Sequence, residues 1–234
     1  MANLKYLYIA SIALSNLLFC QGPSFAAGMV PETTLLLINE ADHGGTMMVK
    51  NTDNTPSLLY TMVNDIAPDK SVIINVTQPV VRLEPGQEQQ VRFVLETQEP
   101  MTVEHYKRVI FEGIPPKGKD KNVKVGINIR QDIPVLIHPK SLPVVTDAWT
   151  LLTWVSDGQT LKVKNTSAYV VRFSQGVTLQ PSGQQGSIPK SFILPGETLD
   201  VKLDKPLGSN QTVTFEPASR YGIKVDNYTA PIVR

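Results

Sequence analysis

Cysteine is almost absent from this chain, and the single one, Cys20, lies in a segment that we expect to be removed. Lys5 precedes a mostly apolar run from Leu7 to Phe19, and Ser24-Phe25-Ala26 places small residues where a signal peptidase reads. This pattern predicts a signal peptide over residues 1–26, and the apolar run is short for a membrane anchor. An exported chain without disulfides must obtain its stability from core packing.

An excess of charge of either sign is also missing. The predicted leader holds one lysine and no acid, so the mature chain would carry 21 basic and 21 acidic residues. A balance of this kind gives no electrostatic reason to expect nucleic acid or an anionic membrane surface as a partner.

Catalytic and metal-binding patterns are missing as well. The three histidines, His43, His105 and His138, are far apart and fit structural or surface roles, and the mature chain has no thiol for zinc or nucleophilic chemistry. No phosphate-binding glycine loop or nucleophile elbow occurs. We therefore expect no enzyme, metal or cofactor, although the sequence leaves an acid/base pair of carboxylates open.

Helical periodicity is nearly absent, and short β-rich runs separated by turn residues take its place. Seven such runs occur in the first half, a spacing typical of an immunoglobulin-like β-sandwich. They are Thr34–Ile38, Thr46–Lys50, Leu58–Val63, Val72–Val76, Gln90–Leu95, Lys107–Phe111 and Lys124–Ile129.

A second set of runs follows a proline-containing segment, residues 139–147, that reads as a linker. Asp157-Gly158 predicts a tight hairpin between two of these runs. VKNTDNTPSLLY, which starts at Val49, is echoed by VKNTSAYVVRF, which starts at Val163. LEPGQEQQVRF, which starts at Leu83, is echoed in the same order by LPGETLDVKL, which starts at Leu194. We therefore predict an all-β protein of two related sandwiches, residues 27–138 and 148–234. The runs of the second half are Trp149–Val155, Gln159–Lys164, Tyr169–Ser174, Val177–Gln180, Lys190–Ile193, Thr198–Leu203 and Gln211–Glu216.

The most informative strand is NVKVGINIRQDIPVLIHP, which spans residues 122–139. Val123, Val125, Ile127 and Ile129 alternate with polar residues and would share one face. The strand follows a polar loop and runs into Pro134, which has no N–H for a ladder and favours a sheet edge, a strand end or a bulge. An aliphatic strand with a free edge is an aggregation hazard unless it pairs with another chain.

Two further segments carry a resemblance to a known family. QPVVRLEPGQEQQVRF (residues 78–93) and EHYKRVIFEGIPP (residues 104–116) are similar to motifs of the periplasmic pilus chaperones of the chaperone–usher pathway, the PapD-like family. The resemblance covers the whole mature chain and implies an L-shaped pair of immunoglobulin-like domains.

The resemblance also implies a mechanism. A pilus subunit lacks its last strand, and the chaperone would lend the strand with Val123, Val125, Ile127 and Ile129 to the open groove, then deliver the subunit to an outer-membrane usher. The protein would act in the periplasm without cofactor. Self-association through the same edge is a further hypothesis for the free chaperone.

The chain departs from the family at positions that bind the subunit's terminal carboxylate. Leu35 and Pro134 stand where most members carry Arg and Lys, which suggests an archaic or alternative branch, and Arg92, Arg108 and Arg130 are candidate replacements. The family's interdomain Arg and Asp fall on His138 and Arg220, which puts that ion pair in question as well.

A competing hypothesis is a secreted two-domain adhesion or receptor module. It would use the glycosylation sequons at Asn75, Asn165, Asn210 and Asn227. A third hypothesis, a hydrolase on a sandwich scaffold, finds no catalytic constellation.

Overall fold

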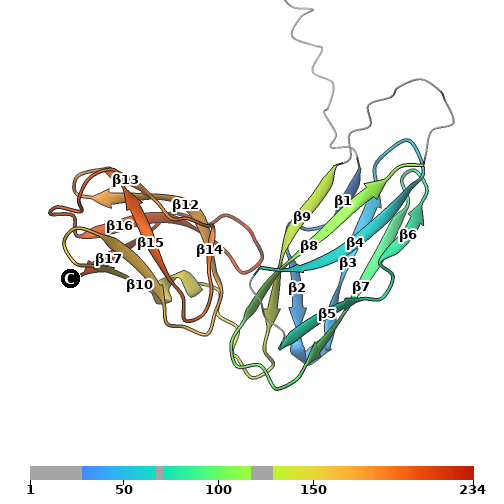
Figure 1. Cartoon of the computed structure of the whole chain (residues 1–234), viewed down its shortest axis with the longest axis horizontal. Helices are drawn as coiled ribbons and strands as arrows, with labels where there is room; N and C mark the ends of the chain where they lie inside the picture. The colour runs from blue at the N-terminus through green and yellow to red at the C-terminus, as the bar shows by residue number, and fades with distance from the viewer. Residues whose placement is uncertain (1–27, 67–70, 117–128) are drawn as a thin grey trace, which may run out of the picture.

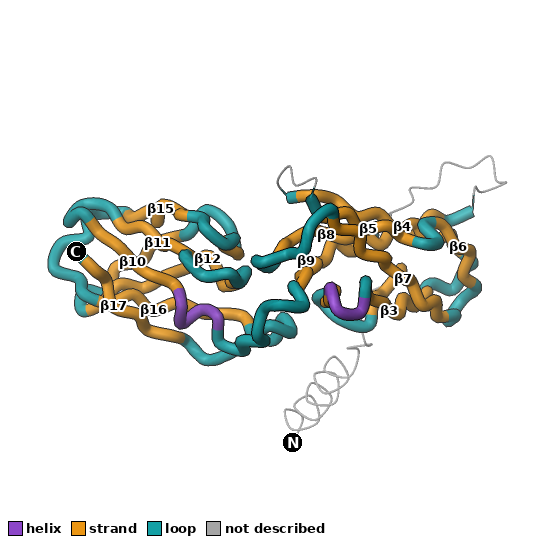
Figure 2. The backbone as a smooth tube through the Cα atoms, turned by 90° about the horizontal axis from the view of Figure 1, so that it is seen from below, coloured by secondary structure: helices purple, strands orange, loops and turns teal. Residues whose placement is uncertain are grey.

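The computed structural model describes residues 28–66, 71–116 and 129–234. The described chain forms two β-sheet units, joined end to end and set at an angle to each other (Figures 1 and 2). This confirms the predicted all-β class and the pair of sandwiches. The described residues contain two helices, both short 3-10 turns, η1 (Glu40–Asp42) and η2 (Ala148–Leu151), and neither could cross a membrane.

The strands of the N-terminal unit form one continuous hydrogen-bonded sheet that folds over on itself. The strands run in the order β5-β7-β3-β2-β9-β8-β4-β6, with β1 paired to β3. Its core cluster includes Phe93 and Phe111, whose rings meet edge to face with centroids 6.4 Å apart. The strands are β1 (Met29–Pro31), β2 (Leu36–Asn39), β3 (Gly44–Asn51), β4 (Ser57–Asp65), β5 (Val72–Val76), β6 (Val80–Leu83), β7 (Glu88–Thr97), β8 (His105–Ile114) and β9 (Arg130–His138).

The C-terminal unit has the order β13-β15-β11-β10-β17-β16-β12-β14. Its core contains Trp154 and Phe215 in ring contact at 5.2 Å. The predicted hairpin is confirmed, because β10 and β11 pair around Gly158, whose φ of 94° suits glycine. The strands are β10 (Leu152–Ser156), β11 (Leu161–Asn165), β12 (Val171–Gln180), β13 (Gln184–Ser187), β14 (Phe192–Ile193), β15 (Thr198–Leu203), β16 (Thr212–Ala218) and β17 (Tyr228–Val233).

Two element predictions in this unit differ from the structure. The predicted strand Trp149–Val155 begins too early, because residues 149–151 belong to the 3-10 turn η2. The runs Tyr169–Ser174 and Val177–Gln180 are a single strand, β12, whose pairing with β16 shifts register between Phe173 and Val177. The residues between them are exposed, so the apolar alternation breaks while the strand continues through a bulge.

The sequence repeat has a structural basis in two fully buried asparagines. Asn51 donates from Nδ2 to the carbonyl oxygens of Thr55 and Leu83, and its own carbonyl accepts the N–H of Gly86. In the second unit Asn165 donates to the carbonyl oxygens of Tyr169 and Ile193, and its carbonyl accepts the N–H of Gly196. In both units, the repeated Asn-Thr segment is therefore hydrogen-bonded to the repeated Pro-Gly turn, and the asparagine side chain holds neighbouring backbone carbonyls. Each set of bonds satisfies backbone groups that burial would otherwise leave without a partner.

Candidate functional site

The edge of β9 is the first feature of the site. β9 pairs with β8 along its whole length, from Arg130 opposite Glu112 to Ile137 opposite His105. On its other side it pairs with β2 only from Val135 onward. Among the described residues, the stretch from Arg130 to Pro134 therefore has an unpaired side. Pro134 is the last residue before the second pairing begins, a place where its missing N–H costs no ladder bond.

The predicted donor residues precede β9 in the sequence. Val123, Val125 and Ile127 are outside the described residues. Ile129 is described and is 39% exposed. Ile129 directly precedes β9, and Ile133, four residues farther on within the strand, is buried in the core of the N-terminal unit.

A row of three residues crosses the opposite face of the sheet at β9, and it includes Leu35 and Pro134, the positions that the sequence resemblance aligned with the family's carboxylate-binding residues. Arg108 on β8 pairs with Pro134 on β9, and the parallel register of β2 places Leu35 on the other side of Pro134. Leu35 is buried in a small apolar cluster with Tyr106, Leu136 and Val170, which joins the two units. The centre of the row is therefore neutral, and Arg108 is the nearest cation on the sheet.

The three arginines nominated from the sequence lie in different places. The Arg108 Nε donates to Asp132 Oδ1 at 2.8 Å, and Nη2 donates to the Asp132 carbonyl. Arg130 forms an ion pair with Glu112, with Nη2 to Oε2 at 2.8 Å. Arg92 is exposed on β7, three strands from β9 in the sheet order. The structure brings Arg108 and Arg130 to the β9 edge and leaves Arg92 apart from them.

A second basic residue of β8, Lys107, faces the other way. It is 3% exposed, shares the inward side of the strand with Val109, and forms an ion pair with Asp65 on β4. Its place inside the unit fits a structural role. Its burial could not be predicted from the sequence, because lysine is rarely buried.

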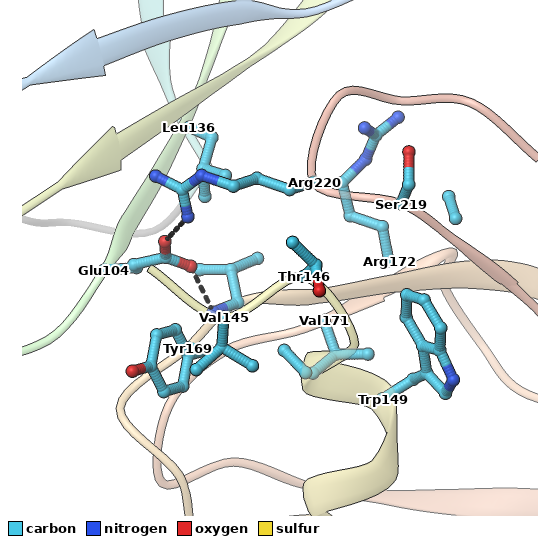
Figure 3. Close-up of a pocket in the computed structure, with 13 residues that line it drawn as sticks. Glu104, Leu136, Val145, Thr146, Trp149, Tyr169, Val171, Arg172, Ser219 and Arg220 are labelled. Atoms are coloured by element: carbon cyan, nitrogen blue, oxygen red, sulfur yellow. Dashed lines mark hydrogen bonds and ion pairs between the residues drawn. The ribbon is translucent and has the colours of Figure 1, made fainter. Parts of the chain in front are cut away.

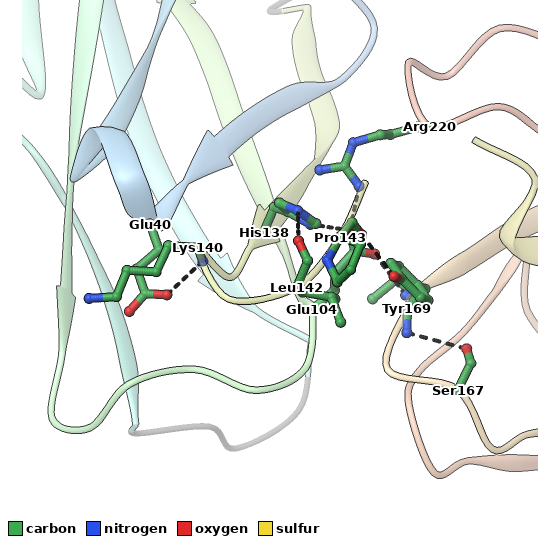
Figure 4. A network of polar contacts seen from close by, with 10 residues as sticks. Glu40, Glu104, His138, Lys140, Leu142, Pro143, Ser167, Tyr169 and Arg220 are labelled. Carbon is green, nitrogen blue, oxygen red and sulfur yellow. Dashed lines mark hydrogen bonds and ion pairs between the residues drawn. The ribbon is translucent and has the colours of Figure 1, made fainter. Parts of the chain in front are cut away.

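The contact between the two units is built on Glu104, which was missed in the sequence. Its Oε1 accepts from Arg220 Nη1 at 2.5 Å and meets His138 Nδ1 at 2.9 Å, while Oε2 accepts the N–H of Val170 at 2.9 Å (Figure 4). The side chains of Glu104 and Arg220 are 2% and 5% exposed. His138 and Arg220, which fall on the family's interdomain pair, do not pair with each other here: Arg220 forms an ion pair with Glu104, and His138 contacts the same carboxylate.

The linker side of this contact is also held by polar bonds. The Tyr169 hydroxyl donates to the Pro143 carbonyl at 2.7 Å, and the Lys140 N–H donates to Glu40 Oε2 at 2.9 Å. His138 Nε2 lies 3.0 Å from the Leu142 carbonyl, so both ring nitrogens meet oxygen acceptors. These bonds fix the path of the chain between the units.

A pocket lies beside Glu104 at the domain contact (Figure 3). Its lining includes two arginines of the C-terminal unit, Arg172 on β12 and Arg220 on the β16–β17 loop. Arg220 is neutralised by Glu104. The guanidinium of Arg172 extends toward Ser219, and its Nη1 is buried without a hydrogen-bond partner.

No cluster of potential metal ligands occurs within the described ranges. The described site consists of an open strand side on β9, the adjacent basic residue Arg108 and a polar contact between the two units.

Comparisons with known proteins agree with this reading. Residues 28–143 match the family model described as the pili and flagellar-assembly chaperone PapD N-terminal domain, and residues 147–229 match the PapD C-terminal domain of pili assembly chaperones. The chain belongs to the PapD family of pilus-assembly chaperones. It is a chaperone for pilus subunits, and the family assignment confirms the resemblance found in the sequence.

The relatives extend over nearly the full length. The fimbrial chaperone YhcA of Escherichia coli K12 is 44% identical over 210 residues, which cover 89% of this chain and 92% of YhcA. The YadV chaperone structure has a TM-score of 0.71 at 21% identity, with 87% and 98% coverage. The SafB chaperone in complex with the SafA pilin of Salmonella enterica has a TM-score of 0.70 at 19% identity, with 89% and 98% coverage. At these identities the structures show the shared fold, and the branch within the family stays a prediction.

Proposed function

We propose that this chaperone holds a pilus subunit by donor-strand complementation along the edge of β9. The observation that carries the proposal is the unpaired side of β9 from Arg130 to Pro134, which continues directly from the predicted donor segment. An open strand side offers backbone N–H and C=O groups to an incoming strand, and alternate side chains fill pockets of the partner. A SafB–SafA complex, with a chaperone of the same fold bound to a pilin, supports a subunit as the partner.

The donor side chains would supply much of the driving force. Val123, Val125, Ile127 and Ile129 each contribute about 1.5–3 kcal/mol when fully buried, before the cost of ordering is subtracted. Ile129 is more than one-third exposed in the free protein, so part of this burial is still available to a partner. Another subunit's better-fitting strand would release the complex by replacing the lent strand.

We place this activity in the periplasm, with delivery to an outer-membrane usher. The leader-like segment of residues 1–26 and the lack of cysteine in the rest of the chain support export. A solved relative of the same fold, SfaE, is described as a periplasmic chaperone.

Among the arginines nominated from the sequence, we propose Arg108 for the subunit's carboxylate. It shares a row with Leu35 and Pro134, which occupy the family's binding positions. Arg130 lies farther along the same edge and is paired with Glu112, and Arg92 lies three strands away.

The test is capture of a subunit by donor variants. Tagged wild-type protein and the double variant Ile127→Asp/Ile129→Asp are expressed with the fimbrial proteins of the host, and proteins that co-purify from the periplasm are identified by mass. We expect normal folding of the variant by circular dichroism and loss of the subunit. Ile73→Asp is the matched control, because Ile73 is a 45% exposed isoleucine on the distant strand β5. Equal capture by the donor variant would rule out the donor role.

The competing adhesion or receptor module is disfavoured by the burial of two of its four sequon asparagines, while Asn75 and Asn227 are exposed. Asn165 and Asn210 are 0% and 2% exposed, and both use Nδ2 to donate to backbone carbonyls. A glycan on either amide would have to break these bonds.

A further inference from the structure

Two of the most exposed large apolar side chains of the described residues lie close together between β16 and β17. Ile223 is 66% exposed and Tyr221 is 60% exposed, and both belong to the turn of residues 219–225, the β16–β17 turn. Single exposed apolar residues are normal on protein surfaces, so exposure alone assigns no function to them. Their conformation and their surroundings suggest one.

The β16–β17 turn is held by its own hydrogen bonds. The N–H of Ser219 donates to the carbonyl of Ile223 at 2.8 Å, and the N–H of Gly222 donates to the carbonyl of Ser219 at 2.9 Å. The N–H of Ile223 donates to the Ser219 hydroxyl at 3.1 Å, and a β-bridge between Ala218 and Lys224 closes the turn. The φ of Gly222 is 79°, which suits glycine. The backbone is therefore preorganised, and a partner would not have to order it on binding.

The turn is also fixed against the N-terminal unit. Arg220 pairs with Glu104, and both side chains are almost fully buried. A Cβ placed on Gly222 would lie 3.4 Å from Thr34 Oγ1 and 3.5 Å from Leu35 Cβ. The arginine of the turn is thus buried in the domain contact, while the apolar side chains on either side of the glycine remain in solvent.

This position is next to the end of the open side of β9. The pairing of β2 with β9 begins at Leu36 opposite Val135. A strand that paired with Arg130–Pro134 would lie on the same side of β9 as β2, and it would end close to Leu35, beside which Gly222 lies. Figure 1 shows the connection between β16 and β17 reaching toward the N-terminal unit in the angle between the two units.

We propose that Tyr221 and Ile223 form a second, apolar contact surface for the bound pilus subunit. The inference rests on the proposed function, because the turn continues the surface that begins at the β9 edge. A subunit held along that edge would cover both side chains. Burial of an exposed side chain of this size is enough for roughly tenfold or more in affinity. The C-terminal unit then takes part in binding directly, and Arg220 is a positioning residue for its contact side chains.

The first test measures whether the turn is covered in the complex. Cys20, the one natural cysteine, lies in the predicted leader, so Ile223→Cys and the control Val233→Cys each give a mature chain with a single thiol. Val233 is 51% exposed near the chain end marked C in Figure 1, away from the domain contact. Maleimide labelling rates are compared for the free chaperone and for its complex with the co-purifying fimbrial subunit. We expect Ile223→Cys to react roughly tenfold or more slowly in the complex, because a buried thiol is inert, and Val233→Cys to react equally in both.

The second test measures how firmly the subunit is held. Complexes are bound to affinity resin, and the subunit released over time is quantified. The double variant Tyr221→Ser/Ile223→Ser should release it roughly tenfold or more faster than wild type, and Val233→Ser should match wild type. Because the substituted positions are exposed, we expect all variants to keep the wild-type circular dichroism spectrum.

Equal labelling of Ile223→Cys in free and bound chaperone, or unchanged release from the double variant, would overturn the proposal. Protection in the free chaperone that increases with its own concentration would assign the turn to a second copy of the chain, and it would overturn the proposal as well. If wild type captured no subunit, the proposed function would fail together with this inference. Capture without protection at position 223 would remove the inference alone.

Discussion

Replacing Glu104 is the sharpest test of how the two units are held together. Glu104→Gln removes the carboxylate charge that pairs with Arg220, and Arg220→Met removes the guanidinium. Both side chains are almost fully buried, so water cannot replace the lost partner. Breaking a buried pair on one side costs about 3–5 kcal/mol, against about 0–1 kcal/mol for an exposed pair.

The double variant measures the interaction energy between Glu104 and Arg220 apart from their contacts with other residues. Because neither charge is then left alone, Glu104→Gln/Arg220→Met should cost less than the sum of the two single changes, by about 1–3 kcal/mol. Lys50→Met is the control, since the Lys50–Glu88 pair is about half exposed on both sides, and it should change stability by less than about 1 kcal/mol.

Urea unfolding followed by tryptophan fluorescence measures these differences, because Trp149 and Trp154 both belong to the C-terminal unit. Small-angle scattering reports in parallel whether the angle between the units is kept. Single variants that cost less than about 1 kcal/mol, or a double variant that equals the sum, would refute the role given to the pair.

Three further predictions concern single residues. Hydrogen bonds, above all from the backbone N–H of Thr160, lower the pKa of Asp157 from 3.8 to about 2. The stability that its carboxylate contributes is therefore present at neutral pH and should vanish as the pH falls from about 4 to 2. Carboxyl NMR titration and a comparison with Asp157→Ala check this. Asn165→Ala leaves two buried carbonyls without their donor and should cost about 2–4 kcal/mol in chemical denaturation. Gly44→Ala would place a Cβ 2.0 Å from a backbone oxygen at a φ of 152° and should abolish soluble expression, whereas Gly176→Ala meets nothing within 4 Å and should be tolerated.

The sequence predicted elements where one face of a strand is apolar. β5 matches the predicted run Val72–Val76, and β3 and β15 contain theirs, because alternation records burial on one side. β13 was missed because Gln184–Ser187 is polar on both faces and is a strand only through its pairing with β12 and β15. Tertiary pairing decides such short polar strands.

The site divides in the same way. The alternation that predicts the donor segment is a local sequence pattern, but Arg220 pairs with Glu104 across 116 positions, and Leu35 lies in one apolar cluster with Val170 of the other unit. Spacing along the chain contains no signal for either contact. The resemblance did contain a signal, because His138 and Arg220 stand where the family has Arg and Asp. An arginine in place of the family's aspartate indicates that the pairing has changed, and in the structure Arg220 pairs with Glu104.

In the Glu104–Arg220 contact, the C-terminal unit carries the base where the family carries an acid. This difference limits which domains of relatives could replace a domain of this protein. A chimaera that joined this N-terminal unit to a C-terminal unit with the family's acid at the place of Arg220 would set two carboxylates against each other, with His138 as the nearest base. The reverse exchange would bring two arginines together. The residues on the two sides of the domain contact must therefore change together. Each unit restricts which form of the other unit it can be joined to.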